Sequence, residues 1–122
     1  MVFGCGIDIE EIERFNKHYF DKGRLSDLVY DIFTTKEIEN FSVFGKEAFL
    51  KGFCFKEAFY KAIDNTDIGF KDIEIIFKKD TEFDILKSKV VNTIFEKENV
   101  SDIKVDFETD VKYVICKVLL IK

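Results

Sequence analysis

The sequence contains no proline, no tryptophan, one methionine and one histidine among its 122 residues. Fifteen residues are phenylalanine, and we interpret this skew as a compositional bias and not as a sign of chemistry. The one histidine, His18, falls on the polar side of a predicted helix, so we expect no catalytic role for it. A nucleophilic triad of the Ser/His/Asp type therefore has no convincing set of residues in this chain.

Cysteines are few, and their number is odd: Cys5, Cys54 and Cys116. Because no two of them are close in sequence, a disulfide framework and a zinc site are not expected, and we predict buried thiols in a reducing cytosol. Basic residues are in the minority, with 19 lysines and arginines against 24 aspartates and glutamates and a formal net charge of −5. That charge argues against general nucleic-acid binding, which needs a basic surface to neutralise phosphates.

Long apolar runs, linkers and targeting segments are missing as well. No run approaches the roughly 20 apolar residues of a membrane span, and a carboxylate appears as early as Asp8, which is untypical of a signal peptide. No Pro-, Ser- or Gly-rich stretch divides the chain, and its length suits one domain. We therefore expect a single cytoplasmic domain over residues 1–122. Phosphate loops of the Walker and Rossmann types are also absent.

The first segment predicts a strand followed by a helix. Residues 2–8 are short, apolar and glycine-bearing, which is typical of a buried strand. Asp8 then stands where a helix would begin, and Glu11 three residues later completes a capping-box pattern. Apolar residues recur at helical spacing over 9–20, and Gly23 is expected to end that helix.

The middle of the chain carries two further helical patterns. Thr34 and Glu37 form a second capping box in front of a helix over 35–41. Residues 46–63 form the longest helical pattern, and apolar side chains cover more than half of its circumference. Such a helix is expected at the centre of the fold, because it can be covered on several sides.

The remainder of the chain predicts mainly strands. We expect strands over 72–77, 103–107 and 113–121, a helix over 85–98, and a hairpin at residues 109–110. Helices thus come mostly first and strands mostly last. That order indicates an α+β fold, with helices packed on a small antiparallel sheet, and not a parallel α/β fold.

Three residues are candidates for a phosphate-handling site. Asp8 ends a glycine-bearing buried strand, and Glu57 and Lys61 lie four residues apart on one face of the long helix. Mg²⁺ is usually held by one or two carboxylates together with substrate phosphates and waters, and a nearby lysine can offset charge on a leaving phosphate. Simpler interpretations remain open at this point: Asp8 as a helix cap, and Glu57 with Lys61 as a surface ion pair.

Four segments together resemble the short phosphopantetheinyl transferases, the holo-acyl-carrier-protein synthase family. They are GIDIEEIERF at 6–15, FTTKEIENF at 33–41, FKEAFYKA at 55–62 and FKDIEI at 70–75. The blocks occur in the family order with family-like spacing. The resemblance implies an α+β phosphopantetheinyl transferase fold and a Mg²⁺-dependent enzyme. Such an enzyme moves the 4′-phosphopantetheine arm of coenzyme A onto a serine of an apo acyl carrier protein and releases adenosine 3′,5′-bisphosphate.

The resemblance also implies roles for individual residues. Carried over position by position, it gives Asp8 and Glu57 as magnesium ligands, Lys51, Lys56 and Lys61 as residues that bind coenzyme A, and Arg14 and Arg24 as residues that bind the carrier protein. Glu57, directly or through a metal-bound water, would be the base that activates the serine hydroxyl, and Lys61 would stabilise the departing bisphosphate. Short family members form homotrimers with the substrate cleft between neighbouring subunits, so a homotrimer is expected here.

The sequence departs from the family pattern in three places. The family usually has an arginine four residues before the signature lysine, and this chain has Gly52 there, next to Lys51. A Gly-Lys-Pro turn is absent, and a Ser-x-Ser-His-like segment is replaced by VDFETD at 105–110. If Asp106 and Glu108 face the cleft, they repel coenzyme A phosphates. Two alternatives therefore stay open: an inactive homologue that binds a carrier protein, and a structural subunit of a biosynthetic complex.

Overall fold

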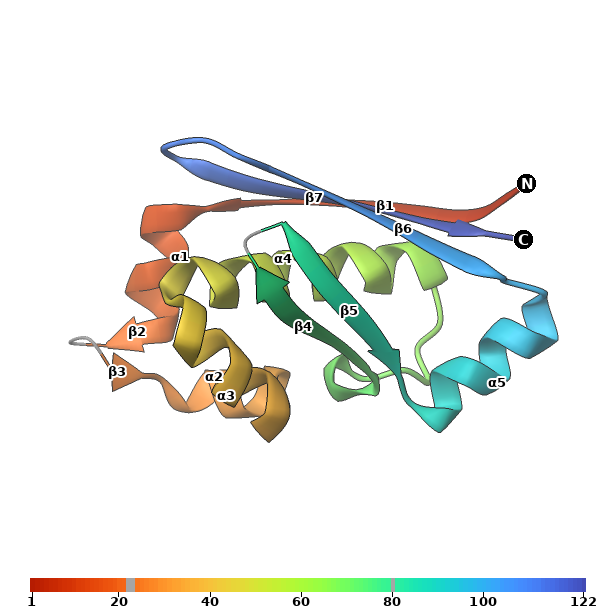
Figure 1. Ribbon diagram of the computed structural model, residues 1–122, viewed down its shortest axis with the longest axis horizontal. Helices are drawn as coiled ribbons and strands as arrows, with labels where there is room; N and C mark the ends of the chain where they lie inside the picture. Colours follow the sequence, from red (N-terminus) through yellow and green to blue (C-terminus); the bar gives the residue numbers. More distant parts are fainter. Residues whose placement is uncertain (22–23, 80) are drawn as a thin grey trace.

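The computed structural model describes residues 1–21, 24–79 and 81–122. Its elements, in chain order, are β1 (Val2–Glu11), α1 (Ile12–Tyr19), β2 (Phe20–Asp21), β3 (Arg24–Leu25), α2 (Asp27–Ile32), α3 (Thr35–Phe44), α4 (Lys46–Ile63), the 3₁₀ turn η1 (Phe70–Asp72), β4 (Ile73–Lys79), β5 (Glu82–Lys87), α5 (Lys89–Glu98), β6 (Asp102–Thr109) and β7 (Tyr113–Ile121). Figure 1 shows β1, β7 and β6 along one side of the molecule and the helices on the other, with the β4–β5 ribbon in front of α4. The predicted α+β architecture is confirmed, and all strand pairs within the described ranges are antiparallel.

β7 is the central strand of a three-stranded sheet with the order β1-β7-β6. The side chains of β7 that face α4 are fully buried: Val114, Cys116, Val118 and Leu120. The opposite, outer face of the sheet is far less covered, and Ile7 and Ile9 on β1 are 47% and 57% exposed there. The sheet therefore has one face packed on α4 and one open face within this chain.

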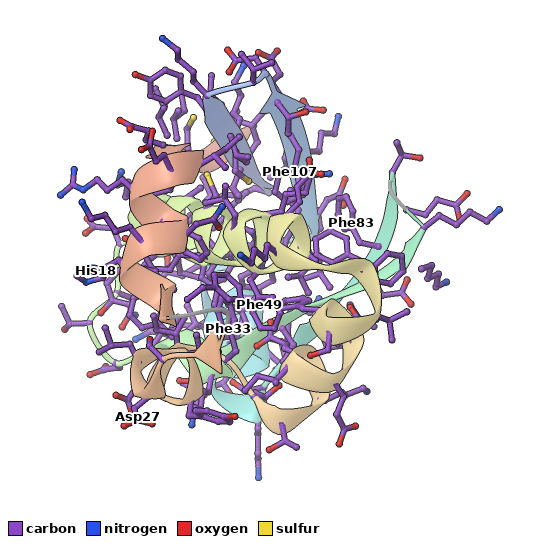
Figure 2. All side chains as sticks on the ribbon, turned by 90° about the vertical axis from the view of Figure 1, so that its left-hand side faces the viewer. His18, Asp27, Phe33, Phe49, Phe83 and Phe107 are labelled. Atoms are coloured by element: carbon purple, nitrogen blue, oxygen red, sulfur yellow. The ribbon has the colours of Figure 1, made fainter. Side chains whose placement is uncertain are left out.

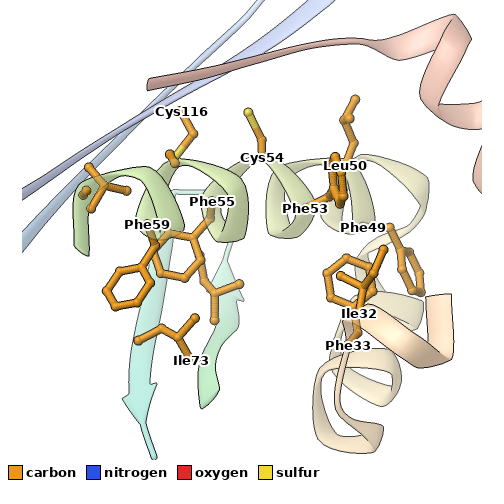
Figure 3. Close-up of a cluster of buried hydrophobic side chains, with 14 of the residues drawn as sticks. Ile32, Phe33, Phe49, Leu50, Phe53, Cys54, Phe55, Phe59, Ile73 and Cys116 are labelled. Atoms are coloured by element: carbon orange, nitrogen blue, oxygen red, sulfur yellow. The ribbon is translucent and has the colours of Figure 1, made fainter. Parts of the chain in front are cut away.

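α4 is the central helix, as its sequence pattern predicts, and its predicted limits at residues 46 and 63 are confirmed. Two layers enclose it: Figure 3 shows Cys54 and Leu50 directed toward the sheet, while Phe55 and Phe59 point to the opposite side, where Ile73 of β4 lies. Phe33 and Phe49 pack edge to face at the other end of the helix, with ring centroids 6.0 Å apart. The aromatic residues of the sequence thus form a core on both sides of one helix (Figure 2).

β1 approaches α4 closely because two glycines face the helix. A Cβ placed on Gly4 would lie 1.9 Å from the carbonyl oxygen of Ala62, and one placed on Gly6 would lie 1.8 Å from that of Ala58. Real Cβ atoms essentially never come within 3.0 Å of such a neighbour. Only residues without a Cβ permit this backbone separation.

The start of the first helix differs from the prediction. Residues 9–11 continue strand β1 and pair with β7, so that Ile9 lies opposite Ile115 and Glu11 opposite Tyr113, and helix α1 begins only at Ile12. Asp8 is therefore inside a strand, and the predicted capping box of Asp8 with Glu11 is wrong. The ladder offered by β7 outweighs a local capping pattern, because it satisfies the backbone groups of these residues.

Several short elements were not predicted, namely β2, β3, α2, η1 and β5, and the start of the last helix was misplaced. The sequence predicted no element where α2 (Asp27–Ile32) lies. Where β5 (Glu82–Lys87) lies, it predicted in part the beginning of a helix. The predicted helix over 85–98 begins only at Lys89, after Ser88 caps it by accepting a hydrogen bond from the Val91 N–H. Gly23, the predicted end of the first helix, lies outside the described residues.

The remaining predicted elements are present. The Thr34 hydroxyl accepts from the Glu37 N–H at 3.2 Å, and the Glu37 carboxylate accepts from the Thr34 N–H at 3.1 Å, which confirms the second capping box. The hairpin between β6 and β7 and the full extent of β7 also agree with the prediction. None of the helices in the described ranges has the length and apolar content that crossing a bilayer demands.

Candidate functional site

Alternation along β1 places Asp8 on the face directed at α4. Asp8 is 9% exposed, and its Oδ1 lies 3.3 Å from Lys61 Nζ. Its second oxygen, Oδ2, is buried and has no hydrogen-bond partner among the described residues. A buried carboxylate oxygen without a partner is costly, so this oxygen indicates a position where a cation or donor completes the site.

Lys61 lies in the last turn of α4, next to β1. Its Nζ donates to the Ile7 carbonyl oxygen at 3.0 Å and contacts Asp8, while 53% of its side chain is exposed. These two contacts therefore hold the ammonium group in place, and an incoming anion can still reach it. Because Lys61 pairs with Asp8, neither simpler interpretation describes the site: Asp8 does not cap a helix, and the ion pair of Lys61 joins α4 to β1.

Asp8, Glu10 and Glu57 form a cluster of carboxylates, and the charges in this cluster raise the pKa values of Glu10 and Glu57. Partial burial raises the pKa of Glu57, the charge of Asp8 raises it further, and Lys61 opposes the shift. Burial likewise raises the pKa of Glu10 to about 7, with smaller contributions from the charges of Asp8 and Glu57. Burial and the charges of Glu10 and Glu57 also raise the pKa of the Tyr19 hydroxyl. The site thus concentrates negative charge that one lysine only partly offsets.

A cleft of about 270 Å³ opens beside these carboxylates. It lies between the end of β1, helix α1 and α4, and its lining consists of Glu10, Glu11, Arg14, Phe15, His18, Tyr19 and Phe53. Arg14 and His18 are exposed on α1, and Figure 2 shows His18 on the outer side of that helix. The cleft joins the predicted carrier-binding residue Arg14 to the carboxylate site, through Glu10.

The donor set fits a divalent cation held by few protein ligands. Within the described ranges, no group of three or more His, Cys, Asp or Glu side chains has the arrangement of a ready metal site. Asp8 nevertheless offers an unpartnered oxygen, and Glu57 belongs to the same cluster of charges. Mg²⁺ commonly uses one or two carboxylates and takes its other ligands from substrate phosphates and water, which this arrangement permits.

Lys56 lies on the other side of α4 from Asp8. Its Nζ is 2.8 Å from Glu37 Oε1, and both side chains are 0% exposed. It also donates to the carbonyl oxygens of Phe70 at 2.6 Å and Ile73 at 2.5 Å. Burial lowers the pKa of Lys56 and raises that of Glu37, while their attraction opposes both shifts. All three donors of this ammonium group are used internally, so its position does not support the expectation that it binds coenzyme A.

Lys51 and Gly52 also lie away from the carboxylate site. The Lys51 side chain is 16% exposed and lies 3.6 Å from Glu47 on its own helix. Gly52 faces the ring of Phe41, and a Cβ there would come within 2.7 Å of it. A large side chain such as arginine at position 52 would displace that ring, which explains the glycine. The side chain of Arg24, the other predicted carrier-binding residue, lies outside the described part of the structure.

The replaced segment near the C-terminus does not face Asp8 in this chain. Asp106 pairs with Lys117 and Glu108 with Ile115, so both acidic residues stand on the outer face of the sheet. Asp8 pairs with Cys116, which faces α4. Within one chain, Asp106 and Glu108 therefore point away from the site, so the repulsion of coenzyme A phosphates expected from them does not act there.

Glu10, Tyr19 and Cys54 are site neighbours that the sequence did not suggest. The Cys54 thiol donates to the Asp8 carbonyl oxygen at 3.1 Å, and burial raises its pKa far above the ordinary range, so it remains a donor. A signal for Glu10 does exist, because residues two apart on a strand share a face. It was not used, since residues 9–11 were assigned to a helix.

The fold and the carboxylate–lysine site define the class of the protein. The chain belongs to the 4′-phosphopantetheinyl transferase superfamily, whose family model matches residues 4–116. That assignment agrees with the resemblance of the four sequence blocks.

Individual relatives are named holo-[acyl-carrier-protein] synthases. The chain is 29% identical over 126 residues to the one from Ligilactobacillus salivarius, covering 100% of this chain and 89% of the relative. It is 39% identical over 87 residues to the one from Caldicellulosiruptor saccharolyticus, covering 66% of this chain and 63% of the relative. It is 42% identical over 82 residues to one from Streptococcus thermophilus, covering 62% of this chain and 66% of the relative. The last two matches span just under two thirds of the relatives' length.

Solved structures share the fold along the whole chain. The holo-[acyl-carrier-protein] synthase of Neisseria meningitidis superposes with a TM-score of 0.81 at 24% identity, covering 100% of both chains. The enzyme of Helicobacter pylori, in complex with coenzyme A, gives a TM-score of 0.75 at 22% identity, covering 95% of this chain and 98% of that one. At these identities the likeness establishes the fold.

Proposed function

We propose that this chain is a holo-acyl-carrier-protein synthase. It transfers the 4′-phosphopantetheine group of coenzyme A to a serine of an apo acyl carrier protein and releases adenosine 3′,5′-bisphosphate. The observation that carries the proposal is the buried, unpartnered Oδ2 of Asp8 beside Lys61 and Glu57, in a chain of the 4′-phosphopantetheinyl transferase superfamily. The names of the relatives support the same reaction.

In the proposed site, Asp8 and Glu57 would hold Mg²⁺. When bound, the ion would supply positive charge that offsets the charge of the coenzyme A pyrophosphate and makes its phosphorus easier to attack. Asp8 is the better fixed of the two ligands, because the Cys54 thiol holds its carbonyl and Lys61 holds one carboxylate oxygen. Glu57 reaches the same place from the middle of α4, one helical turn before Lys61.

The protein residues position the reactants and move one proton. The serine oxygen of the carrier protein attacks the phosphorus that bears the pantetheine arm, and the bond from that phosphorus to the bisphosphate breaks. Glu57 accepts the serine proton; its raised pKa makes it a better base than an ordinary glutamate. Lys61, fixed by the Ile7 carbonyl and half exposed, meets the negative charge of the departing bisphosphate.

The carrier protein is proposed to dock at the cleft beside α1. Arg14 is exposed there and also lowers the pKa of Glu10, so its charge acts on the site. An acidic carrier surface would pair with Arg14 and bring its serine toward Glu57. Acyl carrier proteins of fatty acid synthesis are the partners that the resemblance suggests, and the reaction is proposed to take place in the cytoplasm.

A homotrimer is proposed for the assembled enzyme, with each substrate cleft between neighbouring copies. The outer face of the sheet supports self-association, because its β1 and β7 side chains are mostly apolar: Cys5, Ile7, Ile9, Tyr113, Ile115, Leu119 and Ile121. Ile7, Ile9 and Tyr113 are each at least 40% exposed in the single chain. An exposed apolar patch of this kind is typical of a protein–protein interface.

Mass spectrometry of an apo acyl carrier protein tests the proposal. After incubation with coenzyme A, Mg²⁺ and this protein, we expect the carrier to gain the phosphopantetheine arm. Lys61→Ala should slow that gain by about 10²–10³-fold, the scale of losing one preorganised donor. The control is Lys97→Ala, which removes an exposed lysine of α5 and should leave the rate unchanged.

Two results would contradict the proposal. A carrier protein that gains no mass with the wild-type chain excludes the transferase activity, and an absence of coenzyme A binding by isothermal titration would then favour the inactive homologue. Near-normal turnover by Lys61→Ala would exclude the role assigned to that lysine while leaving the activity itself intact.

A further inference from the structure

The packing of β1 on α4 is a regular series of three close contacts. We call it the β1–α4 contact series, and its members are Gly4 against Ala62, Gly6 against Ala58, and Asp8 against Cys54. Each step advances two residues along the strand, about 6.6 Å, and four residues back along the helix, about 6.0 Å. Strand and helix therefore stay in step up to Asp8, and the Gly6 contact, which is nearest to Asp8 in sequence, determines how far Asp8 stands from the helix.

The two glycine contacts are made through backbone atoms, which cannot rotate away. A Cβ on Gly6 would meet the Ala58 carbonyl oxygen at 1.8 Å, its carbonyl carbon at 2.8 Å and the Ala62 nitrogen at 2.9 Å. To restore the ordinary limit of 3.0 Å, the separation at this point must grow by about 1.2 Å. Because Asp8 follows Gly6 by two residues on the same face of β1, it would move with the strand.

A second observation points to a ligand at the end of this series. Asp8 is 9% exposed, and its buried Oδ2 has no partner in the part of the chain that the structure describes. Glu57 lies on α4 and Asp8 on β1, so the two carboxylates belong to the two elements whose separation next to Asp8 is fixed by Gly6. The span between them is consequently a property of the strand–helix packing and not of side-chain rotamers alone.

We propose that Gly6 is a positioning residue that sets the span between Asp8 and Glu57 and so selects Mg²⁺ over larger divalent cations. This inference rests on the metal site of the proposed function. Mg²⁺ demands oxygen distances of about 2.0–2.1 Å, whereas Ca²⁺ accepts about 2.3–2.6 Å. A displacement of about 1 Å exceeds the tolerance of Mg²⁺ and remains within reach of a larger ion with flexible coordination.

Competition between cations tests the inference without measuring catalysis. Mn²⁺ bound to the protein is followed by electron paramagnetic resonance and displaced by Mg²⁺ or by Ca²⁺, with and without coenzyme A. Gly6→Ala should lower the preference for Mg²⁺ over Ca²⁺ by at least about tenfold, because the change lies next to Asp8. Gly4→Ala is the matched control, because its Cβ makes an equally severe clash but lies four residues from Asp8.

The two glycine variants should lose similar thermal stability and differ in cation preference. A change of less than about threefold is expected for Gly4→Ala. An unchanged preference in a folded Gly6→Ala protein, or equal changes in both variants, would overturn the inference. If the wild-type chain binds neither Mn²⁺ nor Mg²⁺, the metal site of the proposed function fails and this inference fails with it, whereas transfer activity is judged separately by mass spectrometry.

Cys54 provides a gentler variant in case Gly6→Ala does not fold. The distance from its Sγ to the Asp8 carbonyl oxygen is 3.1 Å, a hydrogen-bond distance that a methyl group cannot adopt. Cys54→Val should therefore move Asp8 outward by less than Gly6→Ala and shift the preference toward Ca²⁺ in the same direction. Cys54→Ser keeps a donor and should retain the Mg²⁺ preference; equal preferences in these two variants would contradict the inference.

Discussion

Glu10 is a carboxylate of the site whose pKa is strongly raised, from 4.5 to about 7. Burial and the charges of Asp8 and Glu57 all raise the pKa of Glu10, and the exposed Arg14 lowers it only weakly. The carboxyl group therefore takes up a proton more readily in the folded chain than in the unfolded chain. Its titration can report on the concentration of negative charge at the site before any substrate is added.

We predict that stability falls as pH rises from about 4.5 to about 7. The pKa of Glu10 is raised from 4.5 to about 7 on folding, so in this interval the folded state binds more protons than the unfolded state. Glu57, whose pKa is also raised, contributes in the same direction. Urea unfolding across this pH range should show the loss, and Glu10→Gln should flatten the profile.

Glu39→Gln, which changes an exposed glutamate of α3, is the control for this pH profile. It should reproduce the slope of the wild-type chain. A slope in Glu10→Gln equal to that of the wild type would show that the titration belongs to another group. Saturating Mg²⁺ should reduce the wild-type slope, because a cation at Asp8 and Glu57 relieves their repulsion of a charged Glu10.

The sequence predicted that Asp8, Glu57 and Lys61 lie close together, but it did not predict on which side of α4 Lys56 lies. The four-residue spacing of Glu57 and Lys61 places them on one face of α4 in any helix. Lys56 is their neighbour in sequence, but α4 is buried on both sides, so its pattern has no polar face that tells which layer each lysine meets. Only the packing against Glu37 and β4 decides that.

At the scale of elements, α3 closes one edge of β4 with two side chains. The Asn40 side chain donates to the Phe77 carbonyl oxygen and accepts from the Phe77 N–H, both at 2.8 Å. Glu37 accepts from the Ile75 N–H at 3.0 Å while it holds Lys56. These bonds satisfy backbone groups of β4 that an edge strand otherwise leaves unpaired, and they tie the ribbon to the helices.

We predict that Asn40→Ala destabilises the fold by about 1–3 kcal/mol, because it removes both partners of a half-buried backbone unit. Chemical denaturation measures this loss. Asn92→Ala is the control, since the Asn92 side chain is exposed on α5 and donates a long hydrogen bond of 3.5 Å to the Lys87 carbonyl oxygen. A loss in Asn40→Ala no larger than that of the control would show that water replaces the bonds to Phe77.

Long elements were predictable from local patterns, whereas boundaries set by distant partners were not. α4 and β7 have clear periodicities, and Thr34 with Glu37 carries its capping signal within four residues. The first helix was begun too early because Asp8 and Glu11 match a capping box. The pairing that overrides it comes from Tyr113–Ile115, about a hundred residues away. β5 was missed because its six residues, split from β4 by a short turn, could also extend the next helix.

At the scale of the whole molecule, the sheet has a divided outer face. β1 and β7 present apolar residues there, while β6 presents charged ones: Asp102, Lys104, Asp106 and Glu108. Lys117 lies between the two regions, opposite Ile7 on one side and Asp106 on the other. An apolar stripe with a charged border has the composition of an interface core and its rim.

We predict that Ile7→Lys disrupts self-association. The wild-type protein should sediment at a mass well above the 14.3 kDa of one chain, and Ile7→Lys should sediment as a monomer because it places a charge in the apolar stripe. Val43→Lys, at an 81% exposed position on α3 outside the stripe, should leave the assembly unchanged. A wild-type protein that is monomeric at micromolar concentration would exclude the proposed trimer.

The uneven exposure of the three cysteines has a practical consequence. Cys54 and Cys116 are buried, as predicted, whereas the prediction is wrong for Cys5, which is exposed on the same stripe of β1 as Ile7 and Ile9. The native chain therefore carries a single reactive attachment point for a spectroscopic label, positioned on the face proposed to join the subunits. Subunits joined through this face would cover Cys5, so the rate at which a thiol reagent modifies it would report subunit assembly without engineering a new residue.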